Sequence, residues 1–214
     1  MVTDGLTPLT FLLFAGLVFG SVVVLGGALV ALAMKQPLWV QRLLGLEAVG
    51  LAAYAVIYLV ASLISHNRTL DLGQEKHICE IDCHLAYEVI GVRPAKTWEG
   101  REARGQFWIV TVRVRFDSAT ISARRPRNAS LTPNGRTVAV VDGQGHRYTG
   151  SADDLRRPLV PGESYTTQFV IDVPTTATGL RFFLASGDWE TKLMIGHENA
   201  WLHGKTTFRM GGGS

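Results

Sequence analysis

Residues 108–116 read WIVTVRVRF, and this stretch decides the fold class. Its apolar side chains occupy every second position, at Trp108, Val110, Val112, Val114 and Phe116. Polar side chains lie between them, at Thr111, Arg113 and Arg115. Because successive side chains of a strand point to opposite faces of a sheet, this alternation predicts a β-strand with one buried face.

The same two-residue period recurs in short segments on both sides of this strand. We expect further strands at residues 85–92, 138–141, 147–149, 165–173, 180–184, 192–195 and 206–210. Turn sequences separate several of them, at Asp142-Gly143-Gln144-Gly145 and Pro161-Gly162. The stretches 93–104 and 117–136 are expected to be long polar loops. About seven short strands without a convincing helix predict an all-β, immunoglobulin-like antiparallel sandwich over residues 85–210. Residues 211–214, Gly-Gly-Gly-Ser, are expected to be a linker outside it.

Two long apolar runs precede the β-rich part. Residues 9–34 contain no charged side chain, and residues 43–64 contain only Glu47. Each run exceeds or reaches the roughly 20 residues that a helix needs to cross a bilayer. We therefore predict two transmembrane α-helices at 9–34 and 43–64, so that residues 1–64 form a membrane anchor. A signal peptide cleaved after Ala31-Leu32-Ala33 is the alternative, but the first run is too long for one.

The charges around the anchor predict its orientation. Lys35 and Arg42 lie in the connection 35–42, whereas Asp4 precedes the first helix. Since basic residues favour the cytoplasmic side, the connection is expected in the cytoplasm. Both ends of the chain and the sandwich would then lie outside the cytoplasm, at the inner membrane of a bacterium.

Charge and motif content exclude several functions. The first 64 residues carry only four charged side chains, whereas 19 basic and 16 acidic residues follow, for a net charge of +3. This layout excludes a purely soluble enzyme, a disordered chain and a fibre, and the balanced charges argue against nucleic acid as a partner. No catalytic acid–base or nucleophile motif is present. An accessory subunit is therefore favoured over a stand-alone enzyme.

The β-rich part resembles a known group of domains. The stretch from Trp108 to Val173 contains VVDGQGHRY and LVPGESYTTQFVIDVP. It resembles the telokin-like, immunoglobulin-type extracellular domains of unknown function on many bacterial membrane proteins. Those domains share a fold and no common activity, so the resemblance implies the architecture alone.

Both cysteines lie in one short motif, HICEIDCH, at residues 77–84 of the connector 65–84. Cys79 and Cys83 are flanked by His77 and His84, and His203 offers a further imidazole. Thiolates and imidazoles together favour copper or zinc, which predicts a metal site. A Cys79–Cys83 disulfide is the alternative, since the expected compartment is oxidising and the chain has only two cysteines.

A cysteine pair with this spacing, outside the membrane and behind two transmembrane helices, resembles subunit II of cytochrome c oxidases and their nitric-oxide-reducing relatives. The resemblance implies that Cys79 and Cys83 bridge a pair of copper ions, the CuA centre. It also implies that a backbone carbonyl between the cysteines, taken here as that of Ile81, helps to coordinate the copper ions. It also implies electron transfer from a donor such as cytochrome c to an integral-membrane redox subunit. Tyr87 stands where that family has a histidine, and the cysteines precede the sandwich, so the site would be an analogue on a different domain.

Glu47 is an ionisable residue inside the second apolar run, which makes it a functional candidate. Subunit II of some oxidases places a glutamate at the mouth of a proton path, which suggests a proton-related role by position. The alternative is a carboxylate near the cytoplasmic interface, partly neutralised by Arg42. Gly16 and Gly20 form a small-residue pair that would pack the two helices together or contact another protein.

Overall fold

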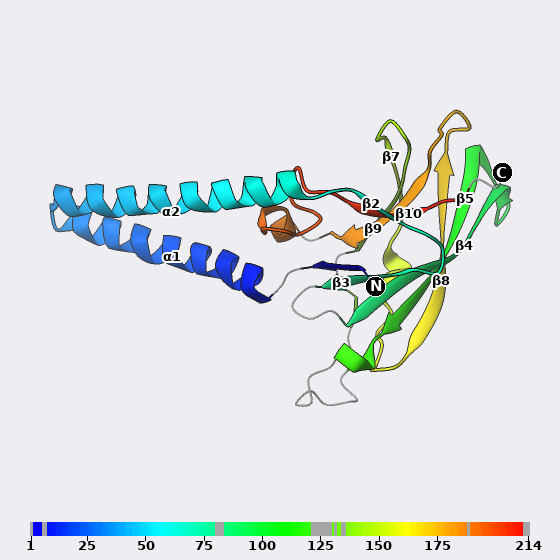
Figure 1. Ribbon diagram of the computed structural model, residues 1–214, viewed down its shortest axis with the longest axis horizontal. Helices are drawn as coiled ribbons and strands as arrows, with labels where there is room; N and C mark the ends of the chain where they lie inside the picture. Colours follow the sequence, from blue (N-terminus) through cyan, green and yellow to red (C-terminus); the bar gives the residue numbers. More distant parts are fainter. Residues whose placement is uncertain are drawn as a thin grey trace.

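The computed structural model describes residues 2–5, 8–79, 84–120, 130, 132–133, 136–187 and 189–211. Two long helices form an antiparallel hairpin that projects from a β-sandwich (Figure 1). They are α1 (Pro8–Ala33) and α2 (Pro37–Ile64), and both are long and apolar enough to cross a membrane. The predicted order of two apolar helices followed by an immunoglobulin-like sandwich is confirmed.

The second helix starts six residues before the predicted start at residue 43. Pro37 occupies the first turn, where its fixed φ suits a helix and its missing N–H costs no hydrogen bond. The first helix ends just before Lys35, which has a left-handed φ of 55°. The predicted connection 35–42 is therefore mostly helical, because proline initiates this helix rather than prolonging the loop.

Ten strands among the described residues form two sheets. The first sheet has the order β1-β3-β4-β5-β8, from Val2–Gly5, Glu75–Cys79, Leu85–Trp98, Arg101–Phe116 and Ser164–Val173. The second has the order β2-β10-β9-β6-β7, from Arg68–Leu70, Thr206–Arg209, Arg181–Ser186, Arg136–Val141 and Arg147–Gly150. The pairs β1–β3 and β2–β10 are parallel, and the other pairs are antiparallel.

The core lies between the two sheets. On β5 the alternating side chains at Val110, Val112, Val114 and Phe116 are buried, as predicted. Aromatic rings from both sheets continue the core, with Phe182 stacked 5.9 Å from Phe169. Burial of each large side chain stabilises the fold by roughly 1.5–3 kcal/mol.

Two predicted segments have a different structure. The expected loop 93–104 is instead a hairpin, because β4 and β5 continue to a tight turn at Glu99 and Gly100. These residues have φ values of 47° and 76°, which is the left-handed pair that a two-residue hairpin turn requires. The expected strand 192–195 belongs instead to the 3₁₀ helix Trp189–Leu193 and the turn after it. Of the expected loop 117–136, only residues 117–120, 130, 132–133 and 136 are described.

The sandwich is fixed to α2 through residues 189–203, which we call the 189–203 segment (Figure 1, orange to red). The Tyr54 hydroxyl donates to the Leu193 carbonyl at 2.8 Å, and the Tyr58 hydroxyl donates to the Lys192 carbonyl at 2.7 Å. The Tyr58 ring also packs with Ile195 and Ala200. The carbonyls of 192 and 193 thus bond to a helix, which is why this stretch pairs with no strand.

Candidate functional site

The predicted Cys/His site falls on the connection between β3 and β4. The last residue pair of this ladder is Ile78 with Leu85, so β3 and β4 form an antiparallel hairpin whose connection follows Cys79. Only the backbone of Cys79 is described, whereas Ile81 and Cys83 lie outside the described residues. The copper site and the disulfide therefore both stay predictions.

The two histidines of the motif are buried on either side of this hairpin. His77 lies on β3, with its Nε2 atom 3.6 Å from the Glu75 carboxylate. His84 directly precedes β4, and its ring lies 5.4 Å from the Phe116 ring. The structure thus brings His77 and His84 to the same end of the first sheet.

His203 lies on the other sheet, just before β10. Its Nδ1 atom donates to the Gly204 carbonyl at 2.8 Å. Within the described part of the chain, no three histidine, cysteine, aspartate or glutamate side chains group so that they could hold a metal ion. The side chains of Cys79 and Cys83 are not among these residues, so the metal site on the cysteine motif stays a prediction.

Glu47 lies at the contact between the helices, where it accepts a hydrogen bond of 2.6 Å from the Ser21 hydroxyl. It is ten residues from the start of α2, or about 15 Å along the helix axis, and a position near the cytoplasmic interface stays a prediction. The Arg42 guanidinium lies instead over the Trp39 ring. A proton-related role for Glu47 stays a prediction.

The small-residue pair on α1 does not pack against α2. A Cβ atom built at Gly16 or Gly20 would meet nothing within 4 Å. A Cβ at Gly27 would lie 3.5 Å from the Leu43 side chain. The helices therefore approach each other near Gly27, and the face that carries Gly16 and Gly20 is open.

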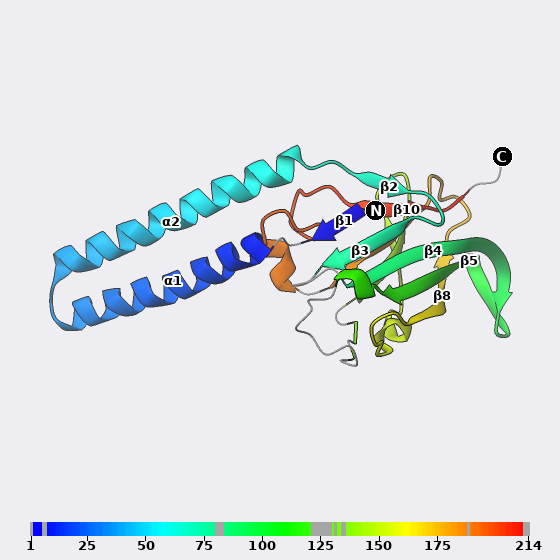
Figure 2. The same ribbon diagram turned by 60° about the horizontal axis from the view of Figure 1, so that its bottom comes forward.

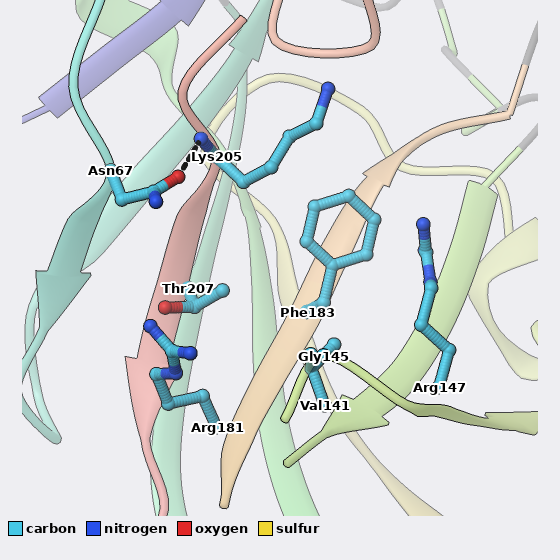
Figure 3. Close-up of a pocket in the computed structure, with 8 residues that line it drawn as sticks. All are labelled: Asn67, Val141, Gly145, Arg147, Arg181, Phe183, Lys205 and Thr207. Carbon is cyan, nitrogen blue, oxygen red and sulfur yellow. Dashed lines mark hydrogen bonds between the residues drawn. The ribbon is translucent and has the colours of Figure 1, made fainter. Parts of the chain in front are cut away.

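A second candidate site lies on the outer face of the second sheet, and we call it the basic groove (Figure 3). It is a hollow of about 200 Å³ beside β9 and β10. Its lining includes three cationic side chains, an aromatic ring and two uncharged polar groups: Arg147, Arg181, Lys205, Phe183, Asn67 and Thr207. Among the described residues that line it there is no carboxylate, so these residues give the groove a net positive charge.

The strand register explains why these cations converge. Arg209 of β10 lies opposite Arg181 of β9, Arg181 lies opposite Val141 of β6, and Val141 lies opposite Arg147 of β7. Three arginines therefore stand in one row across the sheet. Like charges opposite each other on neighbouring strands are destabilising. Only Arg209, at the end of the row, has a carboxylate nearby among the described ion pairs, that of Asp71 at 3.3 Å.

Phe183 forms the floor of the groove. Its ring is only 4% exposed, and the Arg147 guanidinium lies 4.5 Å from the ring centre. Figure 3 shows the side chains of Arg147 and Lys205 extending on either side of this ring. Stacking on an aromatic ring fixes the plane of the guanidinium and leaves its N–H groups free to bind an anion.

Lys205 closes the groove on the side nearer the helices. Its Nζ atom donates to the Ala200 carbonyl at 3.1 Å and to the Glu198 carbonyl. Burial lowers the pKa of Lys205, the charge of Arg147 lowers this pKa further, and Glu198 acts in the opposite direction. An anion in the groove would relieve the repulsion between these cations.

The Glu198 carboxylate, which interacts with Lys205, is already engaged by another lysine. Both oxygens of Glu198 lie 2.7 Å from Nζ of the fully buried Lys76. The same ammonium donates to the carbonyls of Leu184 and Thr206. Glu198 therefore compensates a core lysine, and the cations of the groove remain in excess.

The sequence reasoning missed this groove. Alternation along β9 could have placed Arg181 and Phe183 on one face, opposite the core face of Phe182 and Leu184. In the stretch GHENAWLHGKT at 196–206, the sequence predicted His203 as a metal ligand. In the structure, Glu198 and Lys205 of this stretch make the hydrogen bonds near the groove. No local signal gives the cross-strand register that aligns residues 147, 181 and 209.

Comparison with known proteins gives little beyond the architecture. No protein-family model matches the chain, and no curated protein sequence matches it. Among solved structures, the chain is similar to the secreted protein MPT63 of Mycobacterium tuberculosis, with 16% identity and a TM-score of 0.43. That match covers 67% of this chain and 98% of MPT63. It is also similar to the YjhA protein of Bacillus subtilis, with 13% identity and a TM-score of 0.36, over 67% of this chain and 100% of that one. Neither similarity assigns an activity to this β-sandwich with its two apolar helices.

Proposed function

We propose that this protein is a membrane-anchored, extracytoplasmic binding module that holds a small anion in the basic groove. The observation that carries the proposal is the row of arginines across β10, β9 and β7, in which Arg181 at the centre has no ion pair with a described carboxylate. Such a row destabilises the empty sheet and is stabilised when a negative group lies over it. The ligand would present a phosphate, sulfate or carboxylate group.

The shape of the groove restricts the ligand further. A hollow of about 200 Å³ is smaller than the roughly 300–1,000 Å³ of sites for drug-sized molecules. Arg147 and Arg181 offer paired N–H groups that match planar or tetrahedral oxyanions. Asn67 and Thr207 add uncharged polar groups at the rim. We therefore expect an inorganic or low-molecular-weight oxyanion.

Calorimetric titration of the full chain in detergent with inorganic phosphate, sulfate and citrate tests this proposal. We expect saturable binding of at least one of them, and at least tenfold weaker binding by Arg147→Gln and by Arg181→Gln. Arg101→Gln is the matched control, because Arg101 is 72% exposed on the β4–β5 hairpin. Absence of saturable binding by all three anions, or equal loss in the control, would contradict the proposal.

The pH dependence of binding gives an independent check. Because the pKa of Lys205 is lowered, its ammonium loses charge at a lower pH than the usual lysine value of about 10.4. Anion affinity should therefore decrease as the pH rises through this lowered pKa. Lys205→Met should bind more weakly at pH 7 and should lack this step, as followed by the same titration.

A copper-based electron-transfer subunit is the second candidate. It is supported by the β3–β4 hairpin, in which His77 lies on β3 and His84 directly precedes β4, so that they flank Cys79 and Cys83 in the chain. A thiolate–copper centre would receive electrons from a donor such as cytochrome c and pass them to an integral-membrane subunit. Those reactions are proposals that rest on the cysteine motif.

Copper content and optical absorption of the purified protein test the second candidate. Bound copper with thiolate charge-transfer bands, both lost in Cys83→Ser, would support it. A colourless protein that gains two thiols only after reduction would establish the disulfide and overturn the copper proposal. Neither outcome affects the anion titration, since the groove lies on the other sheet.

The extracytoplasmic orientation is also a proposal, supported by Lys35 and Arg42 near the connection between the helices. Protease added to intact bacterial spheroplasts should remove the sandwich and leave the helical hairpin protected. Cleavage only after lysis of the spheroplasts would place the sandwich in the cytoplasm.

A further inference from the structure

The 189–203 segment is held at a defined depth along α2. Tyr54 and Tyr58 bind it ten and six residues before the helix ends at Ile64. With a rise of 1.5 Å per residue, these contacts lie about 15 Å and 9 Å back from the end of the helix. The Trp201 N–H donates to the Tyr58 hydroxyl oxygen at 2.6 Å and fixes the second half of the segment at the same level.

This level coincides with the expected boundary of the hydrocarbon. The 28 residues of α2 extend about 42 Å, which exceeds the roughly 30 Å of a bilayer core. Trp39 lies near the opposite end of the helix, and 19 residues, or about 28 Å, separate it from Tyr58. A helix with Trp39 at one interface therefore has Tyr58, and the segment bound to it, at the other.

The 189–203 segment carries two groups of apolar side chains, one buried and one exposed. It buries Ile195 and Ala200 in the contact with Tyr58. Trp189, Trp201 and Leu202 of the same segment are 64%, 62% and 68% exposed. Leu202 adopts a left-handed φ of 64°, which is unfavourable for a side chain of this size. Three large exposed apolar side chains on one short segment are unusual on a surface that meets only water.

We propose that Trp189, Trp201 and Leu202 insert into the interfacial layer of the lipid bilayer, as a third membrane contact beside the two helices. The Trp201 N–H is bonded to Tyr58, which places this tryptophan at the level along α2 where tryptophan is favoured in membrane proteins. Lys192, which is exposed on the same segment, can reach lipid phosphate. The contact restricts the tilt of the sandwich on the membrane, and this inference does not depend on the basic groove.

Quenching of tryptophan fluorescence by brominated lipid tests this proposal. The full chain is reconstituted into phosphatidylcholine vesicles with bromine near the headgroup end of the acyl chains. Of the five tryptophans, we expect three to be quenched: Trp39, Trp189 and Trp201. In Trp189→Phe/Trp201→Phe, only one of the three remaining tryptophans should be quenched, so the quenched fraction should fall.

The control is Trp98→Phe, because the β4–β5 hairpin turns at the end of the sandwich away from the helices (Figure 1). Here the quenched fraction should rise, because an unquenched tryptophan is lost. The proposal is overturned if the double variant is quenched to the same fraction as the original chain. Pure lipid vesicles contain no other protein. A segment that binds a protein partner instead of lipid would therefore leave the quenched fraction of the double variant unchanged. Phenylalanine keeps the apolar volume, and circular dichroism verifies that each variant is folded.

Discussion

Gly204 lies where the chain before β10 crosses the chain that leaves α2. Its N–H donates to the Ser65 hydroxyl at 2.6 Å, and a Cβ atom here would lie 2.3 Å from the carbonyl carbon of His66. That distance is impossible for a real contact, so the position requires glycine. The close approach also allows Asn67 to bind the Lys205 N–H at 2.8 Å beside the basic groove.

Gly204→Ala should therefore destabilise the sandwich by about 1–3 kcal/mol, the usual cost of forcing extra volume into a packed site. Chemical denaturation of the full chain in detergent measures this effect. Gly211→Ala is the matched control, because a Cβ there would meet nothing within 4 Å. Equal stability of the two variants would show that the crossing can relax.

Glu75 gives the sandwich a pH-dependent contribution to stability. Arg115 donates to both of its carboxylate oxygens, at 2.9 and 2.8 Å. This pair of hydrogen bonds lowers the pKa of Glu75, although burial acts in the opposite direction. A carboxyl group with a lowered pKa stabilises the folded state fully above its unfolded value of about 4.3. That stability is lost as the pH falls through the lowered pKa.

The stability difference between the original chain and Glu75→Gln should therefore be constant above about pH 5 and shrink below the ordinary glutamate pKa. Melting temperatures measured between pH 7 and pH 3 would show this convergence. Parallel curves over the whole range would mean that the Arg115 contact contributes no proton-linked stability.

At the scale of the elements, the buried pair of Lys76 and Glu198 forms a polar link between the sheets. It connects β3 of the first sheet with the carbonyls of Leu184 on β9 and Thr206 on β10. All donors of this ammonium have acceptors nearby, so the pair is tolerated in the core. Removing one partner would leave a buried charge without compensation.

Lys76→Met and Glu198→Met should each destabilise the sandwich by about 3–5 kcal/mol. The double variant should lose much less than the sum of the two, because two apolar side chains can pack where the charges were. A double-mutant cycle from denaturation curves measures this coupling. Additive losses would mean that the two residues act independently.

Much of each strand could be predicted, because burial of one face imposes a two-residue period on the sequence. The expected strands at 138–141, 165–173 and 206–210 agree with β6, β8 and β10. The β4–β5 hairpin was not predicted, because Glu99 adopts a left-handed conformation that glutamate rarely takes. The stretch 192–195 was misassigned, because its carbonyls bond to tyrosines of α2.

The basic groove could not be predicted, because it depends on pairing between segments far apart in the chain. Arg147, Arg181 and Arg209 share a row only through the registers of β7, β6, β9 and β10. A shift of one residue in any of these pairs would turn an arginine to the other face. Residue composition carries no information on such a register.

At the scale of the whole molecule, Tyr54 and Tyr58 make the anchor and the sandwich one unit. The Tyr58 hydroxyl both donates to the Lys192 carbonyl and accepts from the Trp201 N–H. A flexible tether would need none of these contacts. The orientation of the sandwich relative to the helices is therefore part of the fold.

Tyr54→Phe/Tyr58→Phe should loosen the 189–203 segment, since each hydrogen bond contributes about 0.5–1.5 kcal/mol. Amide hydrogen exchange of this segment should become about tenfold faster or more, as measured by mass spectrometry in detergent. Tyr148→Phe is the matched control, because its hydroxyl bonds to Asp142 near the β6–β7 turn. Unchanged exchange in the double variant would mean that apolar packing alone holds the segment.

The pairing of β1 with β3 joins the residues before α1 to the first strand after Leu70 (Figure 2). A soluble fragment excised at residue 65 would lack β1 and would leave the backbone groups of β3 bare. Such an uncovered strand is a template for pairing with another copy. Truncated preparations would therefore be prone to self-association, and a monodisperse sample requires the helical hairpin to be kept.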